Sequence, residues 1–263
     1  MTTYRHLKKA ISARICALCL ILAFSLPATA IDLLDEDLHY VITYKWGLIN
    51  KDAATAVLSL RNDGPYYQAQ LAASTLPWAD KVLMVRDTLI STMSRPSCFP
   101  VEYQKITHEG SRYGNDVVKF SNSGNNVTGY ATRMRSKNRG PVSESDTVLH
   151  AKSPALDMLS VFYYLRTMDF SAKSPGATIN VAIFSGKSAE KLSVSYKGIE
   201  TVNVNNRTYR TYHLVFSFTM KGKISSDAMD TWITTDDSRI PVKLEGALPL
   251  GKVRAFYTGA TPR

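Results

Sequence analysis

The sequence predicts an all-β protein, a mainly antiparallel sheet curved into an open barrel or a wrapped sandwich with one packed α-helix. Most of the chain alternates apolar and polar residues with a period of two, as strands with one buried face do. Clusters of Gly, Asn, Ser and Pro separate these segments at short intervals, which favours a sandwich or a barrel over a βαβ fold. One segment departs from this alternation and indicates a mostly apolar helix.

The opening segments predict a β-hairpin. Every second side chain is apolar between residues 38 and 46, residues 54–60 repeat the alternation, and the turn Asn62-Asp63-Gly64-Pro65 stops them. Further strands are expected at residues 66–73, 85–93, 101–107, 116–121, 127–135, 178–184, 191–196, 201–205, 207–220, 229–234, 240–248 and 252–257.

The helix is expected at residues 155–169. Ser153 is suited to the N-cap, Pro154 to the first helical position and Asp157 to the first turn. Apolar residues cover most of the helix circumference, so it cannot stand alone in water. We expect it to lie against the concave side of the sheet or to plug it.

Two other segments interrupt the strands. Residues 77–84 indicate a short helix or a turn that points Trp78 and Leu83 inward. Residues 137–152 are polar and punctuated by Gly and Pro, so they are the nearest to a linker and could divide two halves of one curved sheet. With no internal repeat present, a single domain over residues 31–263 is predicted.

The first 30 residues have the pattern of a bacterial secretory leader. Four basic residues precede an apolar run of about a dozen residues, and Ala28-Thr29-Ala30 supplies the small-x-small motif of signal peptidase. The run is shorter than the ~20 residues of a membrane-spanning helix, and neither cysteine in it has the setting of a lipoprotein cleavage site. We expect cleavage after Ala30 and a soluble periplasmic protein with no transmembrane segment.

Charge and cysteine content bound the partners. Loss of the leader leaves 28 basic and 22 acidic residues, a net charge of +6. This moderate excess suits solubility, or contact with anionic envelope material such as phospholipid headgroups. Cys98 becomes the single cysteine, so no intramolecular disulfide can form. Its setting between Pro96 and Pro100 favours a small buried side chain over a nucleophile or an intermolecular partner.

Basic residues alternate near the end of one predicted strand. On an extended chain Arg133, Arg135, Lys137 and Arg139 share a face, and such a row can contact phosphates or acidic glycans. The alternative is a solvated face that discourages aggregation. No aromatic residues for base stacking lie nearby, so nucleic acid is not an expected partner.

Three blocks of the chain, taken in order, resemble a known family. They are residues 36–47 with their continuation to 56, the segment D-M-L-S-V-F-Y-Y-L-R at 157–166, and W-I-T-T-D-D-S-R-I-P-V at 232–242. They resemble the exported bacterial family known as domain of unknown function 3108. The resemblance implies an exported, mainly antiparallel β architecture with one helix. It implies no established activity, so no catalytic residues carry over.

In the second block, Asp157, Ser160, Tyr163 and Arg166 match the family spacing D-x-x-S-x-x-Y-x-x-R. Such groups on a mostly apolar helix suggest a polar ligand-binding site that faces a cavity. The alternative is structural: Asp157 supports the N-terminal turn, while Arg166 pairs with Asp169 or covers the last carbonyls.

Motifs for catalysis or metal binding are incomplete. The sequence has neither H-E-x-x-H nor G-x-S-x-G, and the four histidines after residue 30 are scattered. Ser188-Ala189-Glu190-Lys191 matches S-x-x-K without its companion motifs, and Gly186-Lys187-Ser188 lacks the upstream glycine of a phosphate-binding loop. The sequence indicates no cofactor and no specific enzyme.

Three functions remain open. The leading hypothesis is a non-enzymatic periplasmic protein that binds an apolar or amphipathic envelope component, such as a lipid, or assists envelope assembly. The alternative is a protein-interaction or scaffolding module that uses strand edges or the basic face to bind an envelope protein. A hydrolase of cell-wall or lipid substrates ranks third, since it would need scattered histidines or acids to converge in one cleft.

Overall fold

A computed structural model describes residues 31–220, 223–224, 229–248 and 251–261. Residues 31–263 form one compact unit. The predicted leader and its cleavage point after Ala30 lie outside the described residues. Among the residues described, no helix has the length and the apolar character needed to cross a membrane.

The first half of this unit is an antiparallel meander. Each strand pairs with the next along the chain, and the short helix α2 (Pro77–Leu83) connects the third strand to the fourth. Alternating apolar and polar residues give each strand a buried face and an exposed face. In the third strand, Tyr67 and Ala69 are buried and Gln68 and Gln70 are exposed. The strands are β1 (Glu36–Trp46), β2 (Ile49–Asp63), β3 (Tyr66–Thr75), β4 (Val85–Ser94), β5 (Phe99–Glu109), β6 (Arg112–Ser123), β7 (Asn126–Lys137) and β8 (Ser143–Lys152).

The second half begins with a two-residue strand, β9 (Ala155–Leu156), and the helix α3 (Ser160–Arg166). β9 runs parallel to its neighbour β10, and the later described strands pair antiparallel. The short strand β13 pairs only with β12, beside the continuous strand order of the sheet. These strands are β10 (Thr178–Phe184), β11 (Ala189–Val204), β12 (Arg207–Met220), β13 (Lys223–Ile224), β14 (Met229–Thr234), β15 (Pro241–Ala247) and β16 (Lys252–Ala260).

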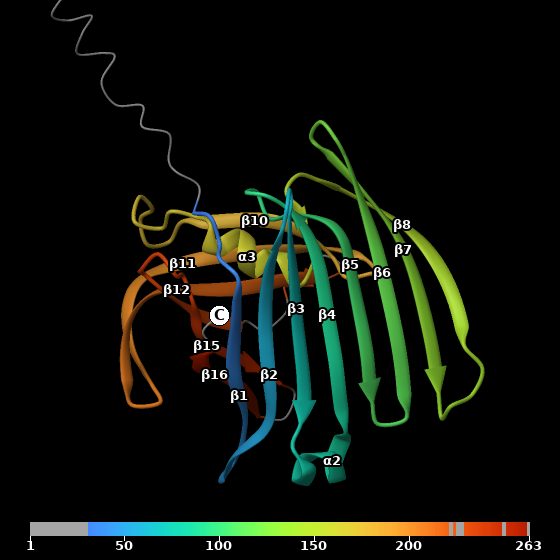
Figure 1. Cartoon of the computed structure of the whole chain (residues 1–263), viewed down its shortest axis with the longest axis horizontal. Helices are drawn as coiled ribbons and strands as arrows, with labels where there is room; N and C mark the ends of the chain where they lie inside the picture. Colours follow the sequence, from blue (N-terminus) through green and yellow to red (C-terminus); the bar gives the residue numbers. More distant parts are fainter. Residues whose placement is uncertain (1–30, 221–222, 225–228, 249–250, 262–263) are drawn as a thin grey trace, which may run out of the picture. The chain divides into compact units, whose positions relative to one another are not determined.

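The two halves join into one barrel-like sheet. β1 pairs with β16, with Tyr40 opposite Tyr257. At the other edges, β8 leads through Ser153 and Pro154 directly into β9, so the two ends of the strand order lie close together. In Figure 1, β1–β8 curve around α3 and β10–β12 cross behind them. The predicted all-β, mainly antiparallel fold with a curved sheet and a packed helix is confirmed.

The helix α3 fills the concave side of the sheet between two hydrophobic clusters. Leu159, just before it, and Tyr163 pack into one cluster, while Val161 and Leu165 pack into the other. All four are at most 4% exposed, and full burial of a side chain such as Leu stabilises a fold by roughly 1.5–3 kcal/mol. The expectation that a helix plugs the concave side is confirmed.

The bounds of this helix differ from the predicted 155–169. β9 occupies the first positions, and α3 begins only at Ser160. The predicted N-cap at Ser153 and the helical start at Pro154 are therefore wrong. A short apolar run is compatible with a buried strand as well as with a helix. Ala155 and Leu156 form a strand because they pair with β10, which is remote in sequence.

The predicted linker at 137–152 is also wrong, because most of it is β8, hydrogen-bonded along β7. Its polar composition has a simple cause, since Leu149 is buried while most of its neighbours are exposed. The strands predicted at 191–196 and 201–205 are one strand, β11, continuous through a register shift after Tyr196. The other predicted strands are all present.

The short helix predicted near residue 77 is confirmed as α2, with Pro77 in its first turn. The inward orientation predicted for Leu83 is wrong, because this side chain is 51% exposed. Ala79 is instead the buried residue of α2. A seven-residue helix at the end of the sheet has little surface to cover it, so most of its side chains face solvent.

Candidate ligand-binding site

An apolar pocket of about 160 Å³ lies between α3 and the inner faces of strands at the β1–β16 junction. Every lining residue is aliphatic, aromatic, Met or Pro. The hydroxyl of Tyr40 donates to the carbonyl oxygen of Pro241 at 2.9 Å, so it offers no unpaired polar group to the pocket. The lining is Tyr40, Ile42, Ala56, Leu58, Leu71, Ala73, Met158, Leu159, Phe162, Pro241, Leu244 and Ala255.

The pocket opens toward the end of the sheet where β1 finishes at Trp46. Ile42, Leu244 and Ala255 line it nearest that end, and all three are half-buried. Tyr40 and Leu58, further from that end, are 5% and 7% exposed. The arrangement is an apolar recess beside α3, and Met158 is its most exposed lining residue at 38%.

The predicted polar set on the helix is buried and bonded to the protein itself. Asp157 accepts the backbone N–H groups of Leu159 and Ser160, each at 2.7 Å, and the hydroxyl of Ser91 at 2.7 Å. Burial raises the pKa of the Asp157 carboxyl, and these hydrogen bonds oppose the rise. The predicted support of the N-terminal turn is thus present, and Asp157 also ties that turn to β4.

Arg166 forms an ion pair with Glu36 of β1 and donates to the carbonyl oxygen of Ser238 at 3.0 Å. The alternative prediction that Arg166 pairs with Asp169 is therefore wrong, because its partners among the described residues are Glu36 and Ser238. Burial lowers the pKa of Arg166, but the hydrogen bonds to Glu36, the negative charge of Glu36 and the nearby Tyr163 and Tyr40 together outweigh this effect and raise the pKa. The hydroxyl of Tyr163 donates to the carbonyl oxygen of Ser59 at 3.3 Å.

Asp157, Ser160, Tyr163 and Arg166 thus surround the same helix, but none of them lines the apolar pocket. All four are at most 1% exposed. Ligand binding by these four polar residues remains a prediction. Their immediate neighbours Met158, Leu159 and Phe162 are the residues of this segment that border the pocket. The periodicity signal found the correct helix, but the pocket side chains are ordinary apolar residues that carry no motif.

The predicted basic row divides into two pairs. Arg133 and Arg135 bond to the buried carboxylate of Asp116, at 3.3 and 2.6 Å. Lys137 ends β7, and Arg139 lies beyond the strand in a turn, at φ 56°. Both are exposed. Arg139 lines a surface pocket of about 530 Å³ and Lys137 lines a neighbouring one of about 390 Å³, and Arg112 lines both. Of the four residues, only Lys137 and Arg139 take part in none of the ion pairs of the described chain.

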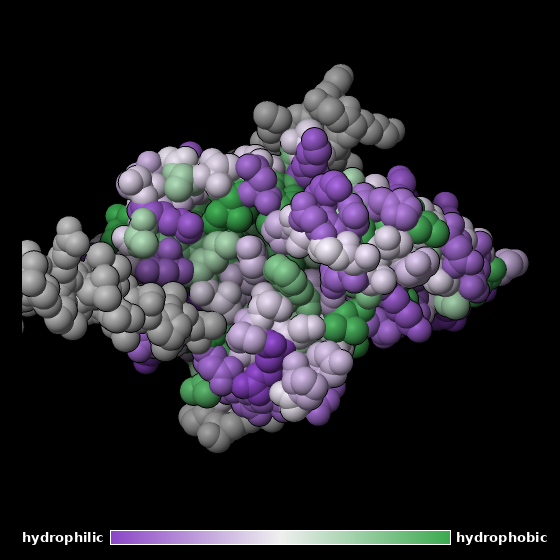
Figure 2. All heavy atoms as spheres, turned by 90° about the horizontal axis from the view of Figure 1, so that it is seen from above, coloured by the Kyte–Doolittle hydropathy of each residue, from purple (hydrophilic) through white to green (hydrophobic). Residues whose placement is uncertain are grey.

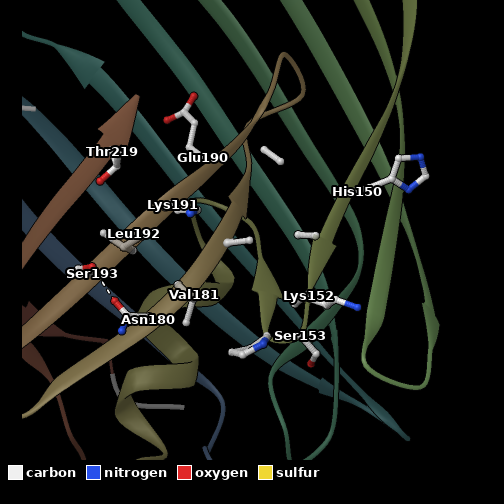
Figure 3. Close-up of a pocket in the computed structure, with 14 residues that line it drawn as sticks. His150, Lys152, Ser153, Asn180, Val181, Glu190, Lys191, Leu192, Ser193 and Thr219 are labelled. Atoms are coloured by element: carbon white, nitrogen blue, oxygen red, sulfur yellow. Dashed lines mark hydrogen bonds between the residues drawn. The ribbon is translucent and has the colours of Figure 1, made fainter. Parts of the chain in front are cut away.

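A gap in the sheet lies where β8 faces β10 and β11. It holds a polar pocket of about 560 Å³, drawn in Figure 3, whose lining includes His150, Lys152 and Glu190. Ser193 donates to Asn180 at 2.6 Å on one wall. Among the described residues, β8 pairs only with β7, so its outer backbone edge is available.

One cluster missed by sequence reasoning surrounds His213 on the outer face. Its ring nitrogens lie 3.2 Å from Glu200 and 2.7 Å from Asp230, and the ring stacks on Trp232 at 4.7 Å. These residues come from β11, β12 and β14, and only the strand register brings them together. Among the described residues, no group of three or more His, Cys, Asp or Glu side chains could hold a metal ion.

The fold and the pocket define a class of protein: a barrel-like antiparallel sheet around a helix that caps an apolar recess. The chain belongs to the family described as protein of unknown function (DUF3108), whose sequence profile matches residues 39–258. The family expected from the three sequence blocks is therefore confirmed. No curated protein matches the chain.

Solved structures share this architecture at low identity. The crystal structure of a β-barrel-like protein of domain of unknown function DUF1849 from Brucella abortus is 8% identical, with a TM-score of 0.59 over 88% of this chain and 99% of that one. A Bacteroides fragilis protein with a YmcC-like fold is 7% identical over 88% and 97%, and its TM-score of 0.38 supports no argument. The likeness to the first extends to fold alone.

Proposed function

We propose that this protein binds the apolar chain of an amphipathic cell-envelope molecule, such as a lipid, in the pocket beneath α3. The observation that carries the proposal is the wholly apolar lining of a recess that is open at one end. The leader pattern of the first 30 residues motivates a periplasmic location. The recess offers no arrangement of acid, base and nucleophile, so binding is the activity that its chemistry supports.

The size of the pocket limits its occupant. A dry apolar cavity of about 150 Å³ holds a molecule such as benzene, and the present pocket is about 160 Å³. A short stretch of hydrocarbon chain therefore fits, with the remainder directed out of the open end. A polar headgroup would stay outside, because the lining has no unpaired polar group to receive it.

A pair of substitutions tests the proposal. Ala73 lines the pocket, and Ala72 lies next to it on the opposite face of β3. Ala73→Leu should fill the recess and weaken binding of a dansyl-labelled fatty acid by roughly tenfold or more, while Ala72→Leu should bind like the wild type. Dansyl fluorescence gives the affinity, and native mass spectrometry of protein purified from the envelope reports any bound lipid. Wild-type protein that neither binds the probe nor carries lipid would exclude this function.

A second candidate function rests on the gap between β8 and β10. An extended segment of an envelope protein could add to the unpaired edge of β8, as in strand addition. A photo-crosslinking residue placed at His150 in the gap should then capture such a segment, whereas one at Tyr130 on the outer face should not. Equal capture at both positions would argue against a strand acceptor.

A further inference from the structure

Five turns of the sheet meet at the end toward which the apolar pocket opens. In an antiparallel meander the connections β1–β2, β3–β4, β5–β6 and β7–β8 all lie at one end, and the start of β16 joins them because Lys252 pairs with Lys45. Figure 1 shows the β1–β2 turn, α2 and the next two turns along the lower edge of the sheet. We call this edge the turn rim: residues 45–51, 81–84, 110–112 and 137–142, with Leu248 and Lys252.

Large apolar side chains are concentrated on the turn rim. Among the described residues, 15 large hydrophobic side chains are exposed, and eight of them lie here. Leu48 at the tip of the β1–β2 turn is fully exposed, and Val82 on α2 is 83% exposed. The eight are Trp46, Leu48, Ile49, Val82, Leu83, Met84, Val142 and Leu248.

The opposite end differs. Its turns contain Asn62-Asp63-Gly64-Pro65 and Ser123-Gly124-Asn125. Two exposed large side chains lie at the first of them, Tyr66 and Leu34, since Asn62 bonds to both neighbours of Leu34. In Figure 2, which looks onto that end, hydrophobic residues show as separate patches between hydrophilic ones. The apolar tips of the turn rim are thus a property of one end and not of turns in general.

The turn rim is also basic. Of its seven exposed cations, Lys252 is ion-paired with Glu245 at 2.7 Å. The other six outnumber the nearby acids that lie outside the ion pairs of the described residues, which are the exposed Asp52 and Glu144 and the half-buried Glu109. None of the ion pairs in the described chain involves Arg112, Lys137 or Arg139. The cations are Lys45, Lys51, Lys81, Arg112, Lys137, Arg139 and Lys252.

Direct contacts make the rim continuous. The ammonium of Lys51 lies 4.5 Å from the ring centre of Trp78 on α2, which joins the β1–β2 turn to the helix. The N–H of Gly110 donates to the carbonyl oxygen of Met84 at 2.7 Å, and the N–H of Asn138 to that of Ser111 at 2.8 Å. The cations and apolar tips therefore belong to one surface.

We propose that the turn rim docks on an anionic phospholipid surface. Trp and Leu side chains next to cations are the composition that partitions into the headgroup region, where rings and aliphatic tips enter the acyl boundary and Lys and Arg meet phosphates. A soluble acidic partner would use the cations but would leave Leu48 and Val82 in water. Docking would bring the open end of the apolar pocket to the lipid surface.

Vesicle sedimentation with the purified protein tests the docking. The wild type should bind phosphatidylcholine vesicles that contain phosphatidylglycerol more tightly than vesicles of phosphatidylcholine alone. Arg112→Ala, Lys137→Ala and Arg139→Ala combined should weaken binding by about fivefold for each cation removed. Leu48→Ala should weaken binding to both kinds of vesicle. The matched control, Lys119→Ala with Tyr130→Ala on the outer face of β6 and β7, should bind as the wild type does.

The fluorescence of Trp46 provides a second measurement. Its emission should shift to shorter wavelength when the protein binds vesicles, and this shift should be lost in Trp46→Phe. The dansyl fatty-acid assay without vesicles is independent, so rim variants that still bind this probe separate docking from the pocket function. No vesicle binding by the wild type, or equal losses in the rim and control variants, would overturn the docking proposal. Salt-sensitive vesicle binding that is unchanged by Leu48→Ala would mean that charge alone holds the protein at the surface, and it would overturn the proposed entry of the apolar tips.

Discussion

Arg166 in α3 and Glu36 at the start of β1 form a two-pronged ion pair in the interior, although 130 residues separate them in sequence. The guanidinium nitrogen Nη2 lies 2.9 Å from Oε2 of Glu36 and also donates to the carbonyl oxygen of Ser238. The Arg166 side chain is 2% exposed and that of Glu36 is 16% exposed. This contact joins the first strand, the helix and the turn after β14 at one point.

Breaking the pair from the carboxylate side should be costly. Glu36→Gln leaves the buried guanidinium without a counter-charge, and removal of one partner of a buried pair costs about 3–5 kcal/mol. Arg166→Met keeps similar volume without a buried charge and should cost less. Urea unfolding measures both. In the double variant the cost should fall well below the sum of the two single costs, and simple additivity would contradict a coupled pair.

Closure of the sheet near β8 depends on a glycine. A Cβ on Gly129 of β7 would lie 2.5 Å from the ring of Phe184, which ends β10 and stacks on Phe120 at 5.4 Å. Gly129→Ala should therefore destabilise the protein by about 1–3 kcal/mol in urea unfolding, since a packed core resists added volume. Gly246→Ala, a strand position with open space around it, is the control. Phe184→Leu should recover part of the loss in Gly129→Ala, and no recovery would locate the strain elsewhere.

The strands could be predicted because their signal is local. A side chain that alternates between core and solvent leaves a period of two in the sequence, and β2 and β3 show it plainly. β8 was hidden because an edge strand with one buried aliphatic residue, Leu149, resembles a loop. β9 was hidden because a two-residue strand is defined only by its partner β10.

The site was only partly predictable for a related reason. The stripe on the helix drew attention to Asp157 and Arg166, but Ser91 and Glu36, which determine their surroundings, lie 66 and 130 residues away. The pocket residues, such as Ile42 and Ala255, are ordinary members of alternating strands. Only the closure of β1 on β16 reveals that a recess remains between them and α3.

Stability should depend on pH through Asp157. Burial raises the pKa of this carboxyl above its ordinary value of about 3.9. The folded state therefore holds the proton more tightly than the unfolded state does, so the contribution of Asp157 to stability is largest at low pH and is lost as pH rises through the raised pKa. Asp157→Asn keeps acceptors for two N–H groups and removes the charge, so its stability relative to the wild type should increase with rising pH.

Urea unfolding over a pH series measures that difference, with Asp237→Asn on the exposed turn as the control. The control should show no comparable trend. A difference between Asp157→Asn and the wild type that does not change with pH would mean that hydrogen bonds from Ser91 and the helix N-terminus fully compensate the burial of the charge.

The thiol of Cys98 should be unreactive in the folded protein and should also report on the leader. Its side chain is buried, and burial raises its pKa to about 12, so almost no thiolate is present at neutral pH. Ellman's reagent should therefore react slowly with native protein purified from the envelope, and rapidly after urea is added. The final count should be one thiol if residues 1–30 have been removed, and three if Cys16 and Cys19 remain. Rapid reaction before unfolding would contradict the buried position of Cys98, whereas a count of three would contradict cleavage after Ala30 and leave the folded unit unaffected.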